Sequence, residues 1–269
     1  MVGRAWSAGL AIIASASIAC SAPETIRSRE TDVTRPVVSS TSIDPQACAH
    51  GIGSDMSTVV DSIPVVVHLP SCFDPRASTR YPVVYLIHGA SADASQWFDI
   101  GIAGNTDTLV ADGAIAPSLW VMASFGDRST SEIARSLVAS IVPWATKALP
   151  TIDDANHRAV GGISRGGGAS MRAAIDHPAM FGAVAGHSPT LPFSLSDTAG
   201  GLVAARCHVW LDVGARDGLR SGTEALGREL ERLGLNVNVD VSAGGHDRKY
   251  WRAHLRDYIR FYAARWKVG

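Results

Sequence analysis

From residue 158 to residue 168 the chain reads RAVGGISRGGG. After Arg158, residues 159–163 are all apolar or glycine, a composition typical of a strand buried on both faces of a sheet. The run that follows, residues 167–176, has the composition of a helix. Ser164 is therefore predicted to lie at a sharp turn between a strand and a helix.

The glycines on either side of Ser164 indicate that this turn carries chemistry. Gly162 and Gly166 must be small because the strand and the helix pass close together, and the turn strains the serine backbone. The helix N-terminus also directs backbone N–H groups and a partial positive charge at this point. A GxSxG pattern alone is common, but between a strand and a helix it predicts a nucleophilic serine. The alternative is a glycine-rich turn whose serine only caps the helix.

Short β-branched runs alternate with longer helical runs along the rest of the chain. The predicted strands are residues 63–69, 82–87, 117–124, 158–163, 182–186, 207–213 and 236–241. The last of these alternates apolar and polar residues and is expected nearer the edge of the sheet. This alternation predicts an α/β fold, a mostly parallel sheet with helices on both faces. Such sheets place their chemistry at the carboxyl ends of the strands.

Three helices between and after these strands have recognisable signals. Residues 129–132 (STSE) form a capping-box pattern, and Pro143 is expected to kink or split the helix that follows. Residues 221–224 (SGTE) are expected to open a second helix in the same way. The last helix carries an apolar face made of Trp251, Leu255, Tyr258 and Tyr262.

A serine nucleophile needs a base, and His246 is placed to provide one. It lies in a glycine-rich loop, AGGHD, between the last predicted strand and the last helix. From that loop its ring can reach Ser164 at the carboxyl end of the sheet. The other histidines after Ser164 are His177, His187, His208 and His254.

The acid that orients His246 is expected near the end of the preceding strand, where two aspartates compete. Asp217 lies in the loop and can reach the imidazole, so we favour it. Asp212 is still within the strand, where its side chain is expected to bond the backbone. Asp217 would hold the His246 tautomer and stabilise the imidazolium.

The tetrahedral intermediate of acyl transfer needs two backbone donors. One is expected from Arg165, directly after the nucleophile, and the other from Ala90, in the loop after the strand at residues 82–87. Because only the backbone is used, the Arg165 side chain is not required for this oxyanion hole. That side chain is expected either to form a salt bridge beneath the site or to bind an acidic group of the substrate.

Several motifs together resemble one family. They are residues 81–89 (YPVVYLIHG), 162–167 (GISRGG), 177–189, 213–217 (VGARD) and 244–247 (GGHD), followed by Trp251. They resemble the esterase family of α/β-hydrolases that includes esterase D-type S-formylglutathione hydrolases, bacterial feruloyl esterases and mycobacterial mycolyltransferases. The resemblance implies the α/β-hydrolase fold and these functional residues: catalytic Ser164, Asp217 and His246, with an oxyanion hole from Ala90 and Arg165.

The resemblance also implies an acyl pocket, and the chain departs from the family in two respects. Trp97 matches the place of a pocket-lining aromatic residue, with core packing as the alternative. Relatives often have methionine or another uncharged residue where this chain has Arg165. The connections at residues 125–129 and 188–204 are short where relatives build lids. We therefore expect little or no lid and an open, shallow cleft suited to bulky or polymer-attached esters.

The composition excludes several functions. Of 269 residues, 46% are hydrophobic and 18% are charged, which suffices for one sizeable core. The 24 Lys and Arg against 25 Asp and Glu argue against a nucleic-acid-binding or polybasic membrane-surface protein. No apolar run reaches the roughly 20 residues of a membrane-spanning helix, and no Cys/His spacing resembles a zinc site.

The N-terminus predicts export. Residues 1–19 predict a signal peptide, with Arg4 followed by an uncharged, mostly apolar stretch, although a short buried helix is an alternative. Residues 17–20 (SIAC) resemble a bacterial lipobox, but Ser17 stands where that pattern prefers leucine, so a lipid on Cys20 stays open. Residues 20–46 predict a flexible tether, and residues 47–269 the catalytic domain. We expect a secreted or envelope-anchored protein.

Three cysteines remain after Cys20. In an exported protein Cys48 and Cys72 are a candidate disulfide pair, because they bracket a predicted first hairpin at residues 47–71. Cys207 is expected to be a small buried hydrophobic residue.

The sequence thus predicts an exported serine esterase that needs no metal or organic cofactor. Its partner would be an ester substrate, with carbohydrate- or polymer-linked esters as candidates, and not a nucleic acid. Two alternatives are an acyltransferase that moves the acyl group to a sugar or another alcohol, and a non-catalytic binding module on a hydrolase scaffold.

Overall fold

The computed structural model describes residue 48 and residues 51–191 and 200–266, all within one compact unit. The predicted signal peptide, Cys20 and the predicted tether lie outside these residues. Part of the connection at residues 188–204 also lies outside them. No helix in the described ranges is both long and apolar enough to cross a membrane.

In the described part of the chain, eight strands form one sheet in the order β1-β2-β4-β3-β5-β6-β7-β8. The β1–β2 and β2–β4 pairs are antiparallel, and the other five pairs are parallel. The strands are β1 (Ser54–Val60), β2 (Ile63–Leu69), β3 (Val83–Ile87), β4 (Leu119–Ala123), β5 (Arg158–Ile163), β6 (Ala183–His187), β7 (His208–Gly214) and β8 (Val237–Ser242). The predicted strands agree with these bounds to within two residues, and β8 is an edge strand, as expected.

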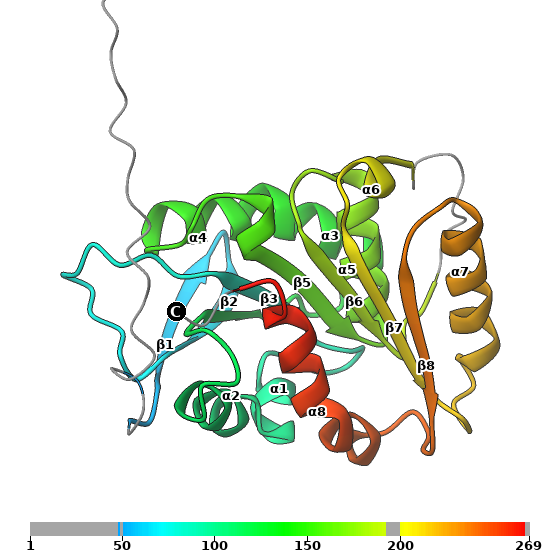
Figure 1. The fold of residues 1–269 in the computed structure, drawn as a ribbon, viewed down its shortest axis with the longest axis horizontal. Helices are drawn as coiled ribbons and strands as arrows, with labels where there is room; N and C mark the ends of the chain where they lie inside the picture. Colours follow the sequence, from blue (N-terminus) through cyan, green and yellow to red (C-terminus); the bar gives the residue numbers. More distant parts are fainter. Residues whose placement is uncertain (1–47, 49–50, 192–199, 267–269) are drawn as a thin grey trace, which may run out of the picture. The chain divides into compact units, whose positions relative to one another are not determined.

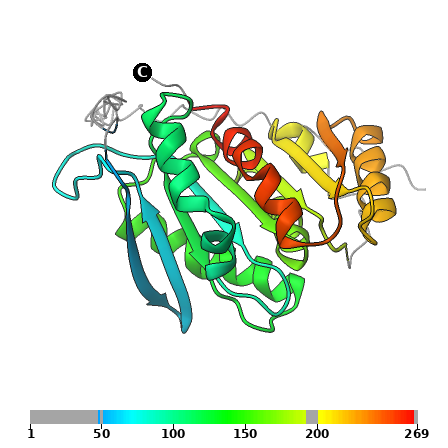
Figure 2. The ribbon, with the colours of Figure 1, turned by 90° about the horizontal axis from the view of Figure 1, so that it is seen from below.

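Helices cover both faces of the sheet (Figures 1 and 2). On one face lie α1 (Ser95–Ile100), α2 (Ile102–Ala111) and α8 (Arg248–Ala263). The other face carries α3 (Thr130–Ser136), α4 (Val142–Ala148), α5 (Arg165–Asp176) and the apolar side of α7 (Arg220–Arg232), while α6 (Gly200–Ala204) is a single short turn. The predicted α/β class, with helices on both faces of a mostly parallel sheet, is confirmed.

Two hydrophobic clusters form the core, one on each face of the sheet. Strand β3 contributes to both, because successive side chains of a strand point to opposite faces. Val83, Tyr85 and Ile87 belong to the cluster with α3–α5, whereas Val84 and Leu86 belong to the cluster with α1, α2 and α8. All five residues are at most 1% exposed, which explains why this strand is a continuous apolar run.

Helix starts were predicted with mixed success. The capping box at Ser129 is present, with Glu132 as its second member. The predicted box at Ser221 is wrong, because α7 already begins at Arg220, and the preceding turn is held by Asp217, whose carboxylate accepts from the Leu219 N–H. The helix expected to kink or split at Pro143 is interrupted just before that residue, where a π-helical segment (Leu137–Ile141) joins α3 to α4, and the proline lies in the first turn of α4.

Cys48 and Cys72 form a disulfide, as predicted, across a sequence separation of 24 residues. We expect its removal by a Cys48→Ser, Cys72→Ser double substitution to lower the free energy of unfolding by about 3 kcal/mol, from loop-closure entropy. Urea unfolding measures this, with Cys207→Ser as the control that removes a thiol and leaves the disulfide intact. An unchanged free energy of unfolding in the double variant would contradict the prediction.

Candidate active site

Ser164 lies at the turn between β5 and α5 in a conformation that few non-glycine residues adopt. Its φ is 56° and its ψ is −116°, and its neighbours form the close approach that the sequence predicted. A Cβ on Gly162 would overlap the backbone of Gly166 and Gly167, and a Cβ on Gly166 would overlap the Ile87 carbonyl. The glycines therefore allow strand β5, helix α5 and the end of β3 to meet, which places the serine hydroxyl at the carboxyl edge of the sheet.

His246 and Ser164 are in direct contact, although 82 positions separate them in the sequence. The His246 Nε2 lies 3.0 Å from the Ser164 Oγ, and the His246 Nδ1 lies 2.8 Å from an oxygen of Asp217. An ionised carboxylate only accepts hydrogen bonds, so Nδ1 carries the proton and Nε2 is free to accept the serine proton. The predicted convergence of these three side chains is therefore present in the structure.

Asp217 is held rigidly, whereas His246 is accessible. The Asp217 side chain is 1% exposed and its second oxygen accepts from the Leu219 N–H at 2.8 Å. The His246 side chain is 35% exposed. Its loop is bonded to the Asp217 loop through the Arg216 N–H, which donates to the Gly244 carbonyl at 2.9 Å. This arrangement leaves one edge of the imidazole open to a substrate.

Asp212, the competing aspartate, does not bond the backbone with its side chain as expected. It accepts hydrogen bonds from side chains instead: His187 at 2.5 Å, Tyr258 at 2.8 Å and Tyr250 at 2.9 Å. His187 in turn contacts the Tyr262 hydroxyl through its other nitrogen at 2.8 Å. These residues form a buried polar cluster at the ends of β6 and β7, five residues before Asp217 in the chain, and no hydrogen bond among the described residues joins it to the Ser164 hydroxyl.

The cluster accounts for features that the sequence left unexplained. Burial, reinforced by the Asp212 carboxylate, raises the pKa of Tyr258 well above its usual range, so its hydroxyl remains a donor. A Cβ on Gly161 would overlap the Tyr262 hydroxyl, so this glycine makes room for the cluster and not only for the turn. The Ser164 N–H donates to the His187 carbonyl at 2.8 Å, which connects the cluster to the turn.

The two expected oxyanion donors lie on either side of the turn. The Arg165 N–H is at the first position of α5, where backbone N–H groups have no partner within the helix. Ala90 is exposed, and the Gly89 beside it lies against the turn, since a Cβ on Gly89 would be 3.6 Å from the Ile163 carbonyl. The Gly89 N–H is already bonded to the Gln96 Oε1 at 2.7 Å, which leaves the Ala90 N–H as the donor of this loop.

The Arg165 side chain departs from one of its two expected roles, the salt bridge, and its expected binding of an acidic substrate group stays a prediction. Within the described ranges it has no carboxylate partner, so the predicted salt bridge is wrong. Its guanidinium donates to two backbone carbonyls instead, Gly126 at 2.6 Å and Gly89 at 3.4 Å. Gly89 directly precedes Ala90, so this side chain contacts the peptide unit that carries the second expected oxyanion donor.

Trp97 lies in the core rather than at the surface. Its side chain is fully buried and its ring packs edge-on against His187, with 6.3 Å between the ring centroids. This position fits the packing alternative and not the lining of an open acyl pocket. The sequence could not separate the two, because an aromatic residue at the start of a helix serves either purpose.

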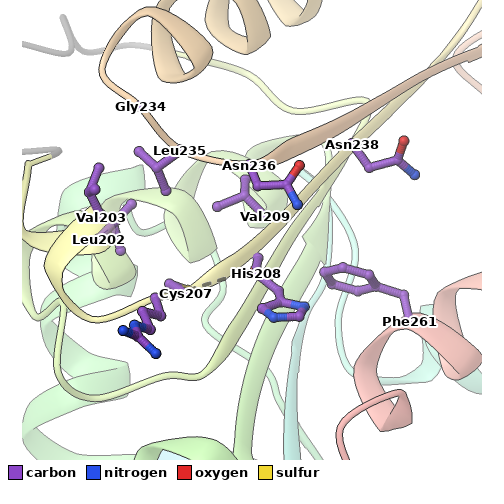
Figure 3. Close-up of a pocket in the computed structure, with 11 residues that line it drawn as sticks. Leu202, Val203, Cys207, His208, Val209, Gly234, Leu235, Asn236, Asn238 and Phe261 are labelled. Atoms are coloured by element: carbon purple, nitrogen blue, oxygen red, sulfur yellow. Dashed lines mark hydrogen bonds between the residues drawn. The ribbon is translucent and has the colours of Figure 1, made fainter.

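A groove of about 350 Å³ lies elsewhere, at the amino ends of β7 and β8 (Figure 3). Cys207, His208, Asn236 and Phe261 are among the residues that line it. Because β5, β7 and β8 run parallel, it is at the opposite end of these strands from Ser164. Burial raises the pKa of the Cys207 thiol to about 12, so it stays protonated and fits its predicted role as a small hydrophobic residue.

The described residues hold no group of three or more His, Cys, Asp or Glu side chains that could bind a metal ion. At the carboxyl edge of the sheet, the Ser164 hydroxyl contacts the His246 imidazole, and the imidazole contacts the Asp217 carboxylate. Together with the backbone N–H groups of Ala90 and Arg165, this hydrogen-bonded series can perform nucleophilic acyl transfer.

Comparison with known proteins gives one family and several relatives. A model named Esterase, with the description "Putative esterase", matches residues 57–262. An endo-1,4-beta-xylanase/feruloyl esterase of Xylanibacter ruminicola is 35% identical over 193 residues, which is 65% of this chain and 25% of that protein. The chain therefore spans about a quarter of the length of this curated relative.

Solved structures with the same fold include two feruloyl esterases. A ferulic acid esterase has a TM-score of 0.72 at 22% identity, covering 81% of this chain and 100% of that one. A variant of the feruloyl esterase module from Clostridium thermocellum, complexed with sinapinate, has a TM-score of 0.69 at 17% identity, covering 81% and 89%. At these identities the likeness establishes the fold alone.

Proposed function

The chain belongs to the Esterase family, and on that premise we propose that it is a serine hydrolase that cleaves carboxylic esters through an acyl-enzyme intermediate. One observation carries the proposal: the hydrogen-bonded series from the Ser164 hydroxyl through the His246 ring to the Asp217 carboxylate. A serine hydroxyl is a weak nucleophile unless a base and an orienting acid adjoin it. A binding module on the same scaffold would have no need of this series.

In the acylation step the Ser164 Oγ attacks the ester carbonyl carbon and its proton passes to His246 Nε2. The carbon–oxygen double bond opens, and the negative charge on its oxygen is stabilised by the N–H groups of Ala90 and Arg165. Asp217 stabilises the imidazolium through Nδ1. The intermediate then collapses, the ester bond breaks, and the leaving alcohol takes the proton from His246.

In the deacylation step a water molecule occupies the place of the alcohol. His246 Nε2 removes a proton from this water as its oxygen attacks the acyl carbon. The second tetrahedral intermediate uses the same two N–H donors. Its collapse breaks the bond to the Ser164 Oγ, which recovers the proton, and releases the carboxylic acid.

Esters of hydroxycinnamic acids are the substrate class that we propose first. The names of the Xylanibacter relative and of the two structural neighbours include feruloyl or ferulic acid esterase. The exposed edge of His246 and the exposed Ala90 support access for an ester attached to a bulky or polymeric alcohol.

We also propose that the protein is exported, either secreted or held at the envelope by a lipid on Cys20. The Cys48–Cys72 disulfide supports this, because disulfides persist in oxidising compartments and are rare in the cytosol.

A fluorophosphonate probe combined with an ester panel tests the proposed activity. We expect the probe to modify Ser164 alone, as mapped by peptide mass spectrometry, and the protein to hydrolyse p-nitrophenyl acetate and methyl ferulate. Modification of a different serine, or no modification and no hydrolysis, would overturn the proposal. Product analysis with an added sugar distinguishes hydrolysis, which yields the free acid, from acyl transfer, which yields the sugar ester.

A further inference from the structure

The carbonyl of Gly89 accepts two hydrogen bonds from side chains. His88 Nδ1 lies 2.7 Å from this oxygen, and the Arg165 Nη2 donates to it at 3.4 Å. A carbonyl oxygen has two lone pairs, so both are occupied. The N–H of the same glycine is also taken, by the Gln96 Oε1 at 2.7 Å.

His88 can act only as a donor toward Gly89. The Phe125 N–H donates to the Nε2 of this ring at 2.9 Å, so Nε2 is unprotonated and the ring hydrogen is on Nδ1. His88 is fully buried. Burial lowers its pKa, outweighing the opposing effect of the hydrogen bond to Gly89, so the neutral tautomer is the stable form.

Holding the Gly89 carbonyl determines where the Ala90 N–H points. The two groups belong to one planar peptide unit, and in a trans peptide they point in opposite directions. No cis peptide occurs in the described residues. Because glycine has no Cβ, sterics alone do not fix the orientation of this peptide plane. Hydrogen bonds to the Gly89 carbonyl therefore have to fix the orientation of this peptide plane.

We propose that the Arg165 side chain, together with His88, is a positioning device for the oxyanion hole. It holds the Gly89 carbonyl so that the Ala90 N–H faces the tetrahedral intermediate. The inference rests on the proposed esterase function and adds a second role to Arg165, whose own N–H is the other donor. Donation to the Gly89 carbonyl also polarises the amide and strengthens the Ala90 N–H as a donor.

Arg165 also connects this loop to its neighbour. Its bond to the Gly126 carbonyl, at 2.6 Å, joins the loop after β4 to the loop after β3. The Phe125–His88 bond joins the same two loops. Both bonds come from one nitrogen, Nη2, whose two hydrogens lie in the guanidinium plane in fixed directions, whereas a lysine ammonium on its flexible stem is oriented less precisely.

Arg165→Met tests the inference, because methionine fills a similar volume and donates no hydrogen bond. For the neutral substrate p-nitrophenyl acetate we expect kcat to fall by about 10- to 100-fold with KM nearly unchanged, as for partial loss of one oxyanion donor. Arg165→Lys is expected to recover part of kcat. The matched control is Arg228→Met, which removes an exposed arginine on α7 with no side-chain hydrogen bond among the described residues and should leave kcat unchanged.

A readout that needs no activity separates this inference from the proposed function. We expect the amides of Gly89 and Phe125 to exchange hydrogen faster in Arg165→Met than in Arg228→Met, because their loops lose a common partner. Unchanged exchange together with a wild-type kcat would overturn the positioning role. A rise in KM confined to negatively charged esters would overturn it too, in favour of substrate-carboxylate binding. If the wild type hydrolyses no ester, the proposed function fails, and the exchange rates still decide whether Arg165 holds the loop.

Discussion

Replacing Ser164 by alanine is expected to lower kcat for ester hydrolysis by at least about 10⁴-fold while leaving the fold intact. The serine oxygen is the atom that bonds to the acyl carbon. In the described part of the chain it is the hydroxyl in contact with His246 Nε2. Alanine keeps the Cβ at this position, which is 9% exposed, so packing changes little. Steady-state kinetics with p-nitrophenyl acetate and the thermal unfolding temperature provide the two measurements.

A matched variant, Ser164→Gly, separates the hydroxyl from the strained backbone. Both variants lack the nucleophile, but only glycine adopts φ 56° and ψ −116° without strain. Glycine gives the unfolded chain more conformational entropy, which offsets part of the gain from relieved strain. We therefore expect Ser164→Gly to be about 1 kcal/mol more stable than Ser164→Ala. A Ser164→Ala protein that is folded and still active would remove the basis of the proposed mechanism.

Replacing Asp217 by asparagine is expected to lower kcat by about 10³- to 10⁴-fold, because an amide can leave His246 in the wrong tautomer. The Asp217 carboxylate accepts from His246 Nδ1 at 2.8 Å. An asparagine that turns its NH₂ group toward Nδ1 would favour the proton on Nε2, where it blocks the acceptance of the serine proton. KM should change little, because Asp217 is buried and does not face the substrate.

Asp212→Asn is the matched control for this prediction, because Asp212 is the other buried aspartate of the same strand-and-loop segment. Its carboxylate accepts from His187, Tyr250 and Tyr258, so its loss is expected to lower the free energy of unfolding by about 3 kcal/mol or more. The kcat of the protein that remains folded should fall much less than in Asp217→Asn. The opposite pattern, a stable but inactive Asp212→Asn and an active Asp217→Asn, would assign the orienting carboxylate to Asp212.

Local patterns were sufficient for seven of the eight described strands and for the three residues of the candidate triad, whereas β1 was anticipated only as part of a hairpin at residues 47–71. A buried strand is apolar on both faces wherever it occurs, and β3 shows this directly by alternating between the two core clusters. The turn at Ser164 requires glycine at positions 162 and 166 because backbone from another element lies where a Cβ would be. Loop placement was enough to select His246 and Asp217, since parallel strands bring their carboxyl ends to one edge.

Contacts between side chains of different strands could not be predicted. His187 and Asp212 are paired only because β6 and β7 align in a register that places these two residues opposite each other. Trp97, on helix α1, is buried because helix packing brings its ring against His187.

The sequence by itself determined that this chain is an α/β protein with a serine at a strand-to-helix turn, because these features depend on residue types at short spacing. Only the tertiary structure decided what the side chains of Arg165, Asp212 and Trp97 contact. Those contacts depend on distances between residues far apart in the chain, which are set by strand register and helix packing and leave no short-range trace in the order of the amino acids.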